Sequence, residues 1–431
     1  MKIKTCIFIC VVLLSLCMTG CAESSDKMNT DTRNADVTEF QGYYANSRVA
    51  NDADNGVYFF AKMTKDDGYF LYYYKNGMDE AIPVCSNTTC SHNDNTCNAY
   101  YASEACVGKN VWYQNGRVYR IESSARANKT YLVSQKKDGT DRVNEAVLWS
   151  GDYMLVQNFW NNCFVLDKGL LYYEIHASAD EDILLMRSGK EHEQETLETL
   201  AYMDGDYVFD GCTMTSYGGK VYYFASYKNS KQSPSLIKYK IYCYDTNSGT
   251  MSMLHEEEGT YEITMSMKDN VFVMEGTGYS GIDFANSAFD KNGNLYVWAR
   301  LTGELKKVDM NTWTAETIYR DDSWGRLRYD GANLVLDNFD SMGTYGCVRK
   351  LVLVNSDTLE SKEIALSELG EENGMVYCYG GNESFILFAG NRAESEGARP
   401  IPNIVYYSTA DGSFTDILDI ESGYIYDMLN D

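Results

Sequence analysis

Short apolar and aromatic segments recur along almost the whole chain, and glycine, asparagine or aspartate separates them. GVYFFAKM, GLLYYEI and GKVYYFASY are examples, and their tyrosine, phenylalanine and β-branched residues suit the half-buried face of a β-sheet. The segments that open each repeat begin near Gly56, Gly116, Gly169, Gly219, Asn270, Gly331 and Glu383. A spacing of roughly 50–60 residues indicates a chain built from repeated sheets.

This repeat predicts an all-β fold, a β-propeller of seven four-stranded blades, with six or eight blades as neighbouring solutions. A lone sheet exposes both faces, whereas sheets packed around one axis bury each other's faces. We assign residues 41–431 to this domain and expect GYIYDML, at 423–429, to add a late strand to the first blade. The fifth repeat has two candidate openings, because Asn294-Leu295 also resembles an opening strand. The alternative is a tandem β-sandwich or an open meander.

The N-terminus has the pattern of an export signal. Lys2 and Lys4 precede an apolar stretch at 7–16, and small residues then lead to Cys21. The stretch is too short for a comfortable membrane span, so the pattern predicts a signal peptide at 1–20.

The end of this signal, Met18-Thr19-Gly20-Cys21, resembles a bacterial lipobox. The resemblance implies a diacylglyceryl anchor on Cys21, followed by a flexible polar tether at 21–40. We therefore expect the protein at the cell membrane, lipid-anchored on the extracytoplasmic face. The alternative is an ordinary cleaved signal in which Cys21 is incidental.

The chain is strongly acidic, with 62 Asp and Glu against 37 Lys and Arg and a net charge of −25. Removal of the leader takes away two lysines and no acid, which lowers the net charge from −25 to −27. A surface this negative repels nucleic acid, so no nucleic-acid partner is expected.

Three cysteines and one of the four histidines lie within CSNTTCSHNDNTC, residues 85–97. Exported chains commonly oxidise neighbouring cysteines, so one hypothesis pairs Cys85, Cys90, Cys97 and Cys106 two by two as disulfides, which staple an insertion at 85–106. The alternative is a metal site in which Cys85, Cys90, His92 and Cys97 form a tetrahedral set that suits zinc. Metal binding requires thiols that stay reduced outside the cell, and the residues alone leave both hypotheses open. No cofactor is expected, and zinc at this cluster is the alternative.

The lipobox, the tyrosine-rich repeats and the cysteine motif together resemble uncharacterised surface lipoproteins of clostridial Gram-positive bacteria. Their motif, C-x4-C-x-H-x4-C-N-A, is matched here by Cys85, Cys90, His92, Cys97, Asn98 and Ala99. The resemblance implies a propeller-like domain and, through an anaerobic habitat, thiols that remain reduced. It implies no particular activity.

No recognised catalytic constellation occurs in the sequence. Both G-x-S-x-G and H-E-x-x-H are absent from it. Asp52-x-Asp54-x-Gly56 and Asp245-x-Asn247-x-Gly249 resemble the start of calcium loops but lack the remaining ligands, which favours plain turns. The isolated cysteines at 163, 212, 243, 347 and 378 are expected to be small buried apolar residues.

Four aromatic residues expected on loops, Trp160, Tyr279, Trp324 and Tyr345, are the candidates for ligand contact at the funnel of a propeller. We therefore expect a binding or interaction module that recognises a glycan, peptide or protein at the cell envelope. The alternative is a propeller-type carbohydrate-active enzyme, a lyase or hydrolase, that uses carboxylates in the central funnel. A third possibility is a purely structural envelope component or a sensor partner of a membrane protein.

Overall fold

The computed structural model describes the chain from Val49 to Asp419 with internal gaps. The described residues are 49–52, 54, 56–61, 68–102, 106–124, 126–150, 164–176, 181–189, 194–268, 271–299, 302–321, 324–340, 347–366, 377–382, 384–392 and 401–419. The expected leader, Cys21, the tether and the late strand at 423–429 all lie outside this part of the chain.

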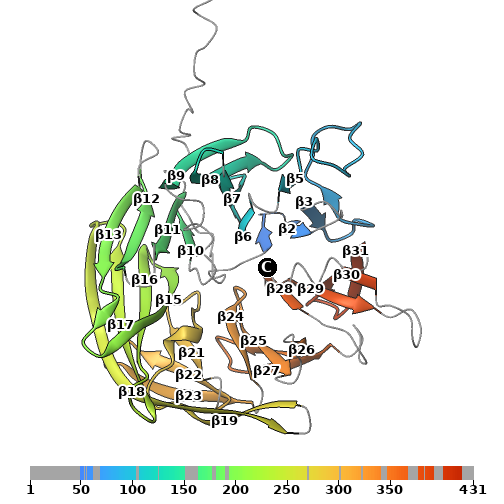
Figure 1. The fold of residues 1–431 in the computed structure, drawn as a ribbon. Coiled ribbons are helices and arrows are strands. Elements are labelled where there is room, and N and C mark those ends of the chain that lie inside the picture. The colour runs from blue at the N-terminus through green and yellow to red at the C-terminus, as the bar shows by residue number, and fades with distance from the viewer. Residues whose placement is uncertain are drawn as a thin grey trace, which may run out of the picture.

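Seven antiparallel β-sheets stand around a common axis as the blades of a propeller, which confirms the predicted fold (Figure 1). Within the described residues, five blades have four strands, the first blade has five strands and the fourth blade has six. The blades follow one another in chain order around the ring.

The first three blades contain strands β1 to β13. The first blade has β1 (Val49–Asn51), β2 (Gly56–Ala61), β3 (Gly68–Lys75), β4 (Ile82–Pro83) and β5 (Tyr100–Ala102). The second has β6 (Cys106–Gln114), β7 (Arg117–Ser124), β8 (Lys129–Lys136) and β9 (Val143–Ser150). The third has β10 (Phe164–Asp167), β11 (Leu170–Ile175), β12 (Ile183–Ser188) and β13 (Gln194–Leu200).

The fourth and fifth blades contain strands β14 to β23 and a short 3-10 helix. The fourth has β14 (Met203–Asp204), β15 (Tyr207–Tyr217), β16 (Lys220–Asn229), β17 (Ser235–Asp245), β18 (Thr250–Lys268) and β19 (Val271–Tyr279). The helix η5 (Phe284–Asn286) leads into the fifth, which has β20 (Ser287–Phe289), β21 (Leu295–Ala299), β22 (Glu304–Asp309) and β23 (Thr314–Arg320).

The last two blades contain strands β24 to β31. The sixth has β24 (Trp324–Tyr329), β25 (Asn333–Asp340), β26 (Cys347–Asn355) and β27 (Ser361–Ala365). The seventh has β28 (Tyr377–Asn382), β29 (Phe385–Arg392), β30 (Ile401–Ser408) and β31 (Phe414–Asp419).

Six of the seven predicted repeat openings lie within two residues of the start of a strand. This is the second strand in five blades and β16, the third strand, in the fourth blade. The prediction was wrong for the fifth repeat, because the segment after Asn270 forms β19, which extends the fourth blade. The second half of the long strand β18 pairs with β19 beyond the end of β17. The fifth blade instead places its second strand at Leu295, the other candidate opening.

Two kinds of turn lead into the second strand of a blade or, in the fourth blade, from β15 into β16. In the second, third and fourth blades, two-residue turns at Asn115-Gly116, Lys168-Gly169 and Gly218-Gly219 have positive φ at both positions. This is the type I′ geometry that matches the twist of a β-hairpin and favours glycine. In the fifth and sixth blades, Asp290 and Asp330 accept backbone N–H groups of the turn instead.

Aromatic and aliphatic side chains fill the spaces between neighbouring blades. Six hydrophobic clusters together cover all seven interfaces, and each contains residues from adjacent blades. The ring closes by contact between the seventh and first blades, where the ring centroids of Tyr74 and Tyr406 are 5.1 Å apart. In the same interface the Ala81 N–H donates to the Ile417 carbonyl at 2.7 Å. Side-chain packing and this hydrogen bond therefore hold the ring closed.

A candidate metal centre in the first blade

A loop that carries the cysteine cluster interrupts the outer edge of the first blade. β4 and β5 pair with consecutive stretches of β3, on the edge opposite β2. The chain leaves this edge at Val84, whose N–H donates to the Leu71 carbonyl at 2.8 Å. It returns at Ala99, whose carbonyl accepts the Leu71 N–H at 2.9 Å. Residues 85–98, which we call the cysteine loop, therefore form an Ω-loop whose two ends meet at one residue.

Two turns of matching sequence present Cys90 and Cys97. Both Asn87-Thr88-Thr89-Cys90 and Asp94-Asn95-Thr96-Cys97 begin with Asn or Asp and end with Thr-Cys. In each turn the first side chain accepts the threonine N–H, at 3.1 Å from Thr89 and 2.9 Å from Thr96. The carbonyl of the same residue accepts the cysteine N–H, at 3.1 Å for Cys90 and 3.3 Å for Cys97. These short-range hydrogen bonds give both cysteines the same local setting.

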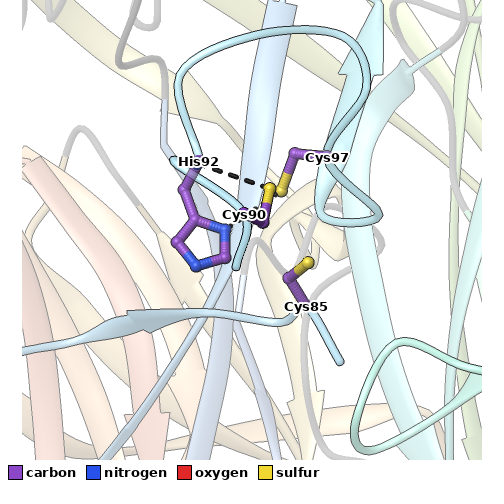
Figure 2. A group of neighbouring side chains, drawn as sticks. All are labelled: Cys85, Cys90, His92 and Cys97. Atoms are coloured by element: carbon purple, nitrogen blue, oxygen red, sulfur yellow. Dashed lines mark hydrogen bonds between the residues drawn. The ribbon is translucent and has the colours of Figure 1, made fainter. Parts of the chain in front are cut away.

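The thiols of Cys85, Cys90 and Cys97 and the imidazole of His92 converge on one point (Figure 2). One ligand atom of each residue lies within 4.8 Å of the others. The Nδ1 atom of His92 is 3.3 Å from the Sγ atom of Cys97. Ligands of tetrahedral zinc with Zn–S bonds of about 2.3 Å lie roughly 3.8 Å apart, so a small contraction of this cluster would accommodate the ion.

Backbone amides point at the sulfur atoms from two residues further along the chain. The His92 N–H donates to Cys90 Sγ at 3.4 Å, and the Ala99 N–H donates to Cys97 Sγ at 3.4 Å. The Asn87 N–H stands in the same relation to Cys85. Amide donors favour the thiolate over the thiol, and the thiolate is the form that binds metals.

The balance between burial and these amides differs among the thiols. Burial raises the pKa of Cys85, but hydrogen bonds from the backbone amides of Asn87 and Asn98 and from the thiols of Cys97 and Cys90 together outweigh it, and the pKa lies below its usual value. For Cys97 burial dominates and raises the pKa to about 12. A metal ion would have to displace the proton of Cys97, as metal binding to cysteine generally does.

The disulfide hypothesis gains no support from the described cysteines. Cys85, Cys90 and Cys97 are free thiols. Cys106 begins β6, the first strand of the second blade, whereas the other three lie at the outer edge of the first blade. The side chain of Cys106 lies outside the described part of the chain.

Of the four aromatic candidates for ligand contact, only Tyr279 has a side chain within the described part of the chain. Tyr279 ends β19 and is half-buried, with its ring centroid 5.3 Å from that of Tyr239, so it lies in a strand rather than on the expected loop. Trp324 begins β24, also a strand, and its side chain is outside the description. Trp160 and Tyr345 lie outside the described residues.

The isolated cysteines and the suspected calcium loops follow the sequence predictions wherever the structure describes them. Cys212 and Cys243 are buried, as expected for small apolar residues. The side chains of the cysteines at 163, 347 and 378 lie outside the described part. Asp52 Oδ1 accepts the Gly56 N–H, and Asp245 Oδ1 accepts the Asn247 N–H, so both motifs are turns.

Glu174 is a buried carboxyl group that no motif in the sequence indicates. It lies in β11, between the third and fourth blades, and its Oε2 atom has no hydrogen-bond partner among the described residues. Burial raises the pKa of Glu174 to about 8, and the neighbouring thiol of Cys212 only partly opposes this. The alternation of a strand predicts which face a glutamate occupies, but not that another blade will cover it.

Comparisons with known proteins support the fold alone. Neither a model of a known protein family nor a curated protein matches the sequence. The structure is similar to a puromycin hydrolase, with a TM-score of 0.50 and 12% identity over 88% of this chain and 55% of that one. It is also similar to a prolyl endopeptidase, with a TM-score of 0.48 and 9% identity over 86% of this chain and 49% of that one.

An oligogalacturonate lyase is a third neighbour, with a TM-score of 0.42 and 10% identity over 70% of this chain and 74% of that one. The chain spans about half the length of the two hydrolases. At 12% identity, the similarity to the puromycin hydrolase supports the fold of the chain, a β-propeller, and not an activity. Among the described residues, no helix has the length and apolar character needed to cross a membrane.

Proposed function

We propose that the protein is a lipid-anchored β-propeller that acts as a binding module on the extracytoplasmic face of the cell membrane. Its partner is a glycan, peptide or protein of the envelope. The observation that carries this proposal is the closed ring, in which seven blades stand around one axis and β28 of the seventh blade contacts β1 of the first. Such a ring gathers loops from every blade on a rigid scaffold, where a ligand can be held by several loops at once.

Attachment to the membrane would depend on the acyl chains of Cys21. A mature net charge of −27 gives the protein no electrostatic attraction to anionic lipid. Two acyl chains are sufficient for stable anchoring, and the polar tether at 21–40 would leave the ring free above the lipid surface.

Metabolic labelling with radioactive palmitate tests the anchor. Wild-type protein should incorporate label and sediment with membranes, whereas the variant Cys21→Ser should incorporate none and leave the membrane fraction, because it has no thiol to acylate at the lipobox. Cys17→Ser is the matched control, since it removes a leader cysteine four residues earlier and should leave labelling unchanged. Equal labelling of wild type and Cys21→Ser would contradict the anchor.

Binding can be tested with the full-length protein in detergent. The protein is applied to an array of cell-envelope oligosaccharides, and intact cells are treated with a crosslinker before purification. Saturable binding to one oligosaccharide class, or one crosslinked envelope protein that rebinds after separate purification, would support the module. Conversion of an oligosaccharide to shorter products would support the enzyme alternative instead, and absence of any saturable partner would contradict the proposal.

A further inference from the structure

We propose that Cys85, Cys90, His92 and Cys97 bind one structural Zn²⁺ ion, and that this ion holds the outer edge of the first blade in place against the second blade. The inference does not depend on the binding role proposed above. The four candidate ligands lie in the first blade, where the structure describes their burial and the contacts of the strand that follows them.

The burial pattern of the cysteine loop separates the four ligands from everything around them. Every other residue between Cys85 and Cys97 is exposed. Cys85, Cys90 and His92 are half-buried and Cys97 is 4% exposed. The loop therefore has no apolar core of its own, and its only inward-facing groups are three thiols and an imidazole. Loops without a core need a covalent or metal staple to keep one conformation.

The number and kind of ligands favour a metal ion over a disulfide. Three thiols can form only one disulfide among themselves, which would leave one thiol and the imidazole unused. The same groups make one complete tetrahedral Cys3His set. Soft sulfur ligands select zinc over magnesium, calcium or manganese, which prefer oxygen. Because all four positions are filled by protein, the ion would be structural and not catalytic.

The strand that follows the cysteine loop connects the site to the second blade. Tyr101, in β5, is buried and donates its hydroxyl hydrogen to Gln135 Oε1 at 2.7 Å. The guanidinium carbon of Arg120 lies 4.2 Å from the centre of the Tyr101 ring, and that of Arg142 lies 5.3 Å from it. Gln135, Arg120 and Arg142 all belong to the second blade or its turns.

The position of Tyr101 therefore depends on where the cysteine loop returns to β3. The Ala99 carbonyl accepts a hydrogen bond from the Leu71 N–H, and β5 begins at the next residue. If zinc fixes the loop, it also fixes the start of β5 and the contact of Tyr101 with Arg120. Loss of the ion should loosen this edge of the first blade and leave blades on the far side of the ring unaffected.

The test uses full-length protein purified under reducing conditions without chelator, with zinc measured by plasma mass spectrometry. We expect one zinc per chain in wild type. Cys90→Ala and His92→Asn should lose it; asparagine suits the left-handed backbone of residue 92, where φ is 53°. His92→Cys should regain zinc, because it restores four ligands. Cys243→Ala, which removes a buried thiol of the fourth blade, is the control and should retain full zinc.

Two further measurements separate a structural ion from an adventitious one. Protein stripped of metal and loaded with Co²⁺ should show the intense visible absorption of tetrahedral thiolate coordination in wild type and Cys243→Ala, but not in His92→Asn. Hydrogen exchange at Tyr100–Ala102 should accelerate at least tenfold when zinc is removed, whereas exchange in β17 should not change.

Three results would overturn the proposal. They are a disulfide between any two of Cys85, Cys90 and Cys97 in the native protein, equal zinc content in wild type and Cys90→Ala, and failure of the stripped protein to bind added Zn²⁺ at micromolar concentration.

Discussion

Glu174 and Asp290 are both buried carboxyl groups, but they differ in their hydrogen-bond partners. Asp290 is fully buried and accepts backbone N–H groups from Asn292 at 2.8 Å and Asn294 at 2.9 Å, with a further bond from the Tyr296 hydroxyl at 3.1 Å. Glu174 lies against the fourth blade with one oxygen unpartnered among the described residues. One carboxyl group therefore organises a turn, whereas burial raises the pKa of the other.

Glu174 makes folding stability depend on pH. Burial raises its pKa from 4.5 to about 8, so between these values the folded state keeps a proton that the unfolded state releases. The contribution of Glu174 to the free energy of unfolding therefore falls as pH rises from about 4.5 to about 8. Replacement by glutamine removes this penalty. Glu174→Gln should gain stability relative to wild type by a few kcal/mol, in order of magnitude, between pH 5 and pH 8.

The measurement is urea unfolding of both proteins at pH 5 and pH 8. Glu181→Gln, which changes an exposed residue of the same blade, should have the same free energy of unfolding as wild type at both pH values. A constant difference between Glu174→Gln and wild type would show that the carboxyl group ionises alike in both states.

Sequence alone identified the four side chains that converge in the cysteine loop, because cysteine and histidine are rare in the chain and closely spaced there. It could not choose between disulfides and metal, since spacing does not report where a loop returns. The structure shows that the backbones of Val84 and Ala99 both form hydrogen bonds with Leu71, and that Cys106 belongs to the next blade. Glu174 could not be foreseen, because its burial arises from a blade that follows later in the chain.

At the scale of elements, the turns between strands carry much of the local information. Glycine at Gly116, Gly169 and Gly219 was visible in the sequence as a repeat opening, and each is the second residue of a two-residue turn with positive φ. The Asp-Lys-Asn-Gly turn at 290–293 was equally visible. The sequence could not distinguish β19 from the strands that open a blade. All of these strands are rich in apolar residues and follow turn-forming residue types.

The turn before β21 should depend on the carboxylate of Asp290. Asp290→Ala leaves two backbone N–H groups without their acceptor, in a turn whose first residue is fully buried. We expect a loss of about 2–4 kcal/mol in the free energy of unfolding.

Denaturant titration of the purified variant measures this loss. Asp309→Ala is a matched control, because Asp309 accepts the Asn311 N–H in an exposed turn of the same blade and should cost less than about 1 kcal/mol. Equal losses for the two variants would contradict a special role for the buried turn.

In the whole molecule, the ring closes between the first and seventh blades, which are far apart in the sequence. The rings of Tyr74 and Tyr406 pack together across that interface, and the Ala81 N–H donates a hydrogen bond to the Ile417 carbonyl. The repeat spacing predicted the ring and the approximate number of blades, because each unit can bury its faces only against a neighbour. It could not predict how the ends join, and the expected strand at 423–429 lies outside the described residues.

X-ray diffraction from crystals of the full-length protein, collected on both sides of the zinc absorption edge, tests closure and metal together. We expect seven radial sheets with β28 beside β1. We also expect one anomalous peak about 2.3 Å from the sulfur atoms of Cys85, Cys90 and Cys97 and about 2.0 Å from the coordinating nitrogen of His92. Two stacked sheets or an open arc would contradict the fold. Continuous sulfur–sulfur density without a peak would contradict the zinc site.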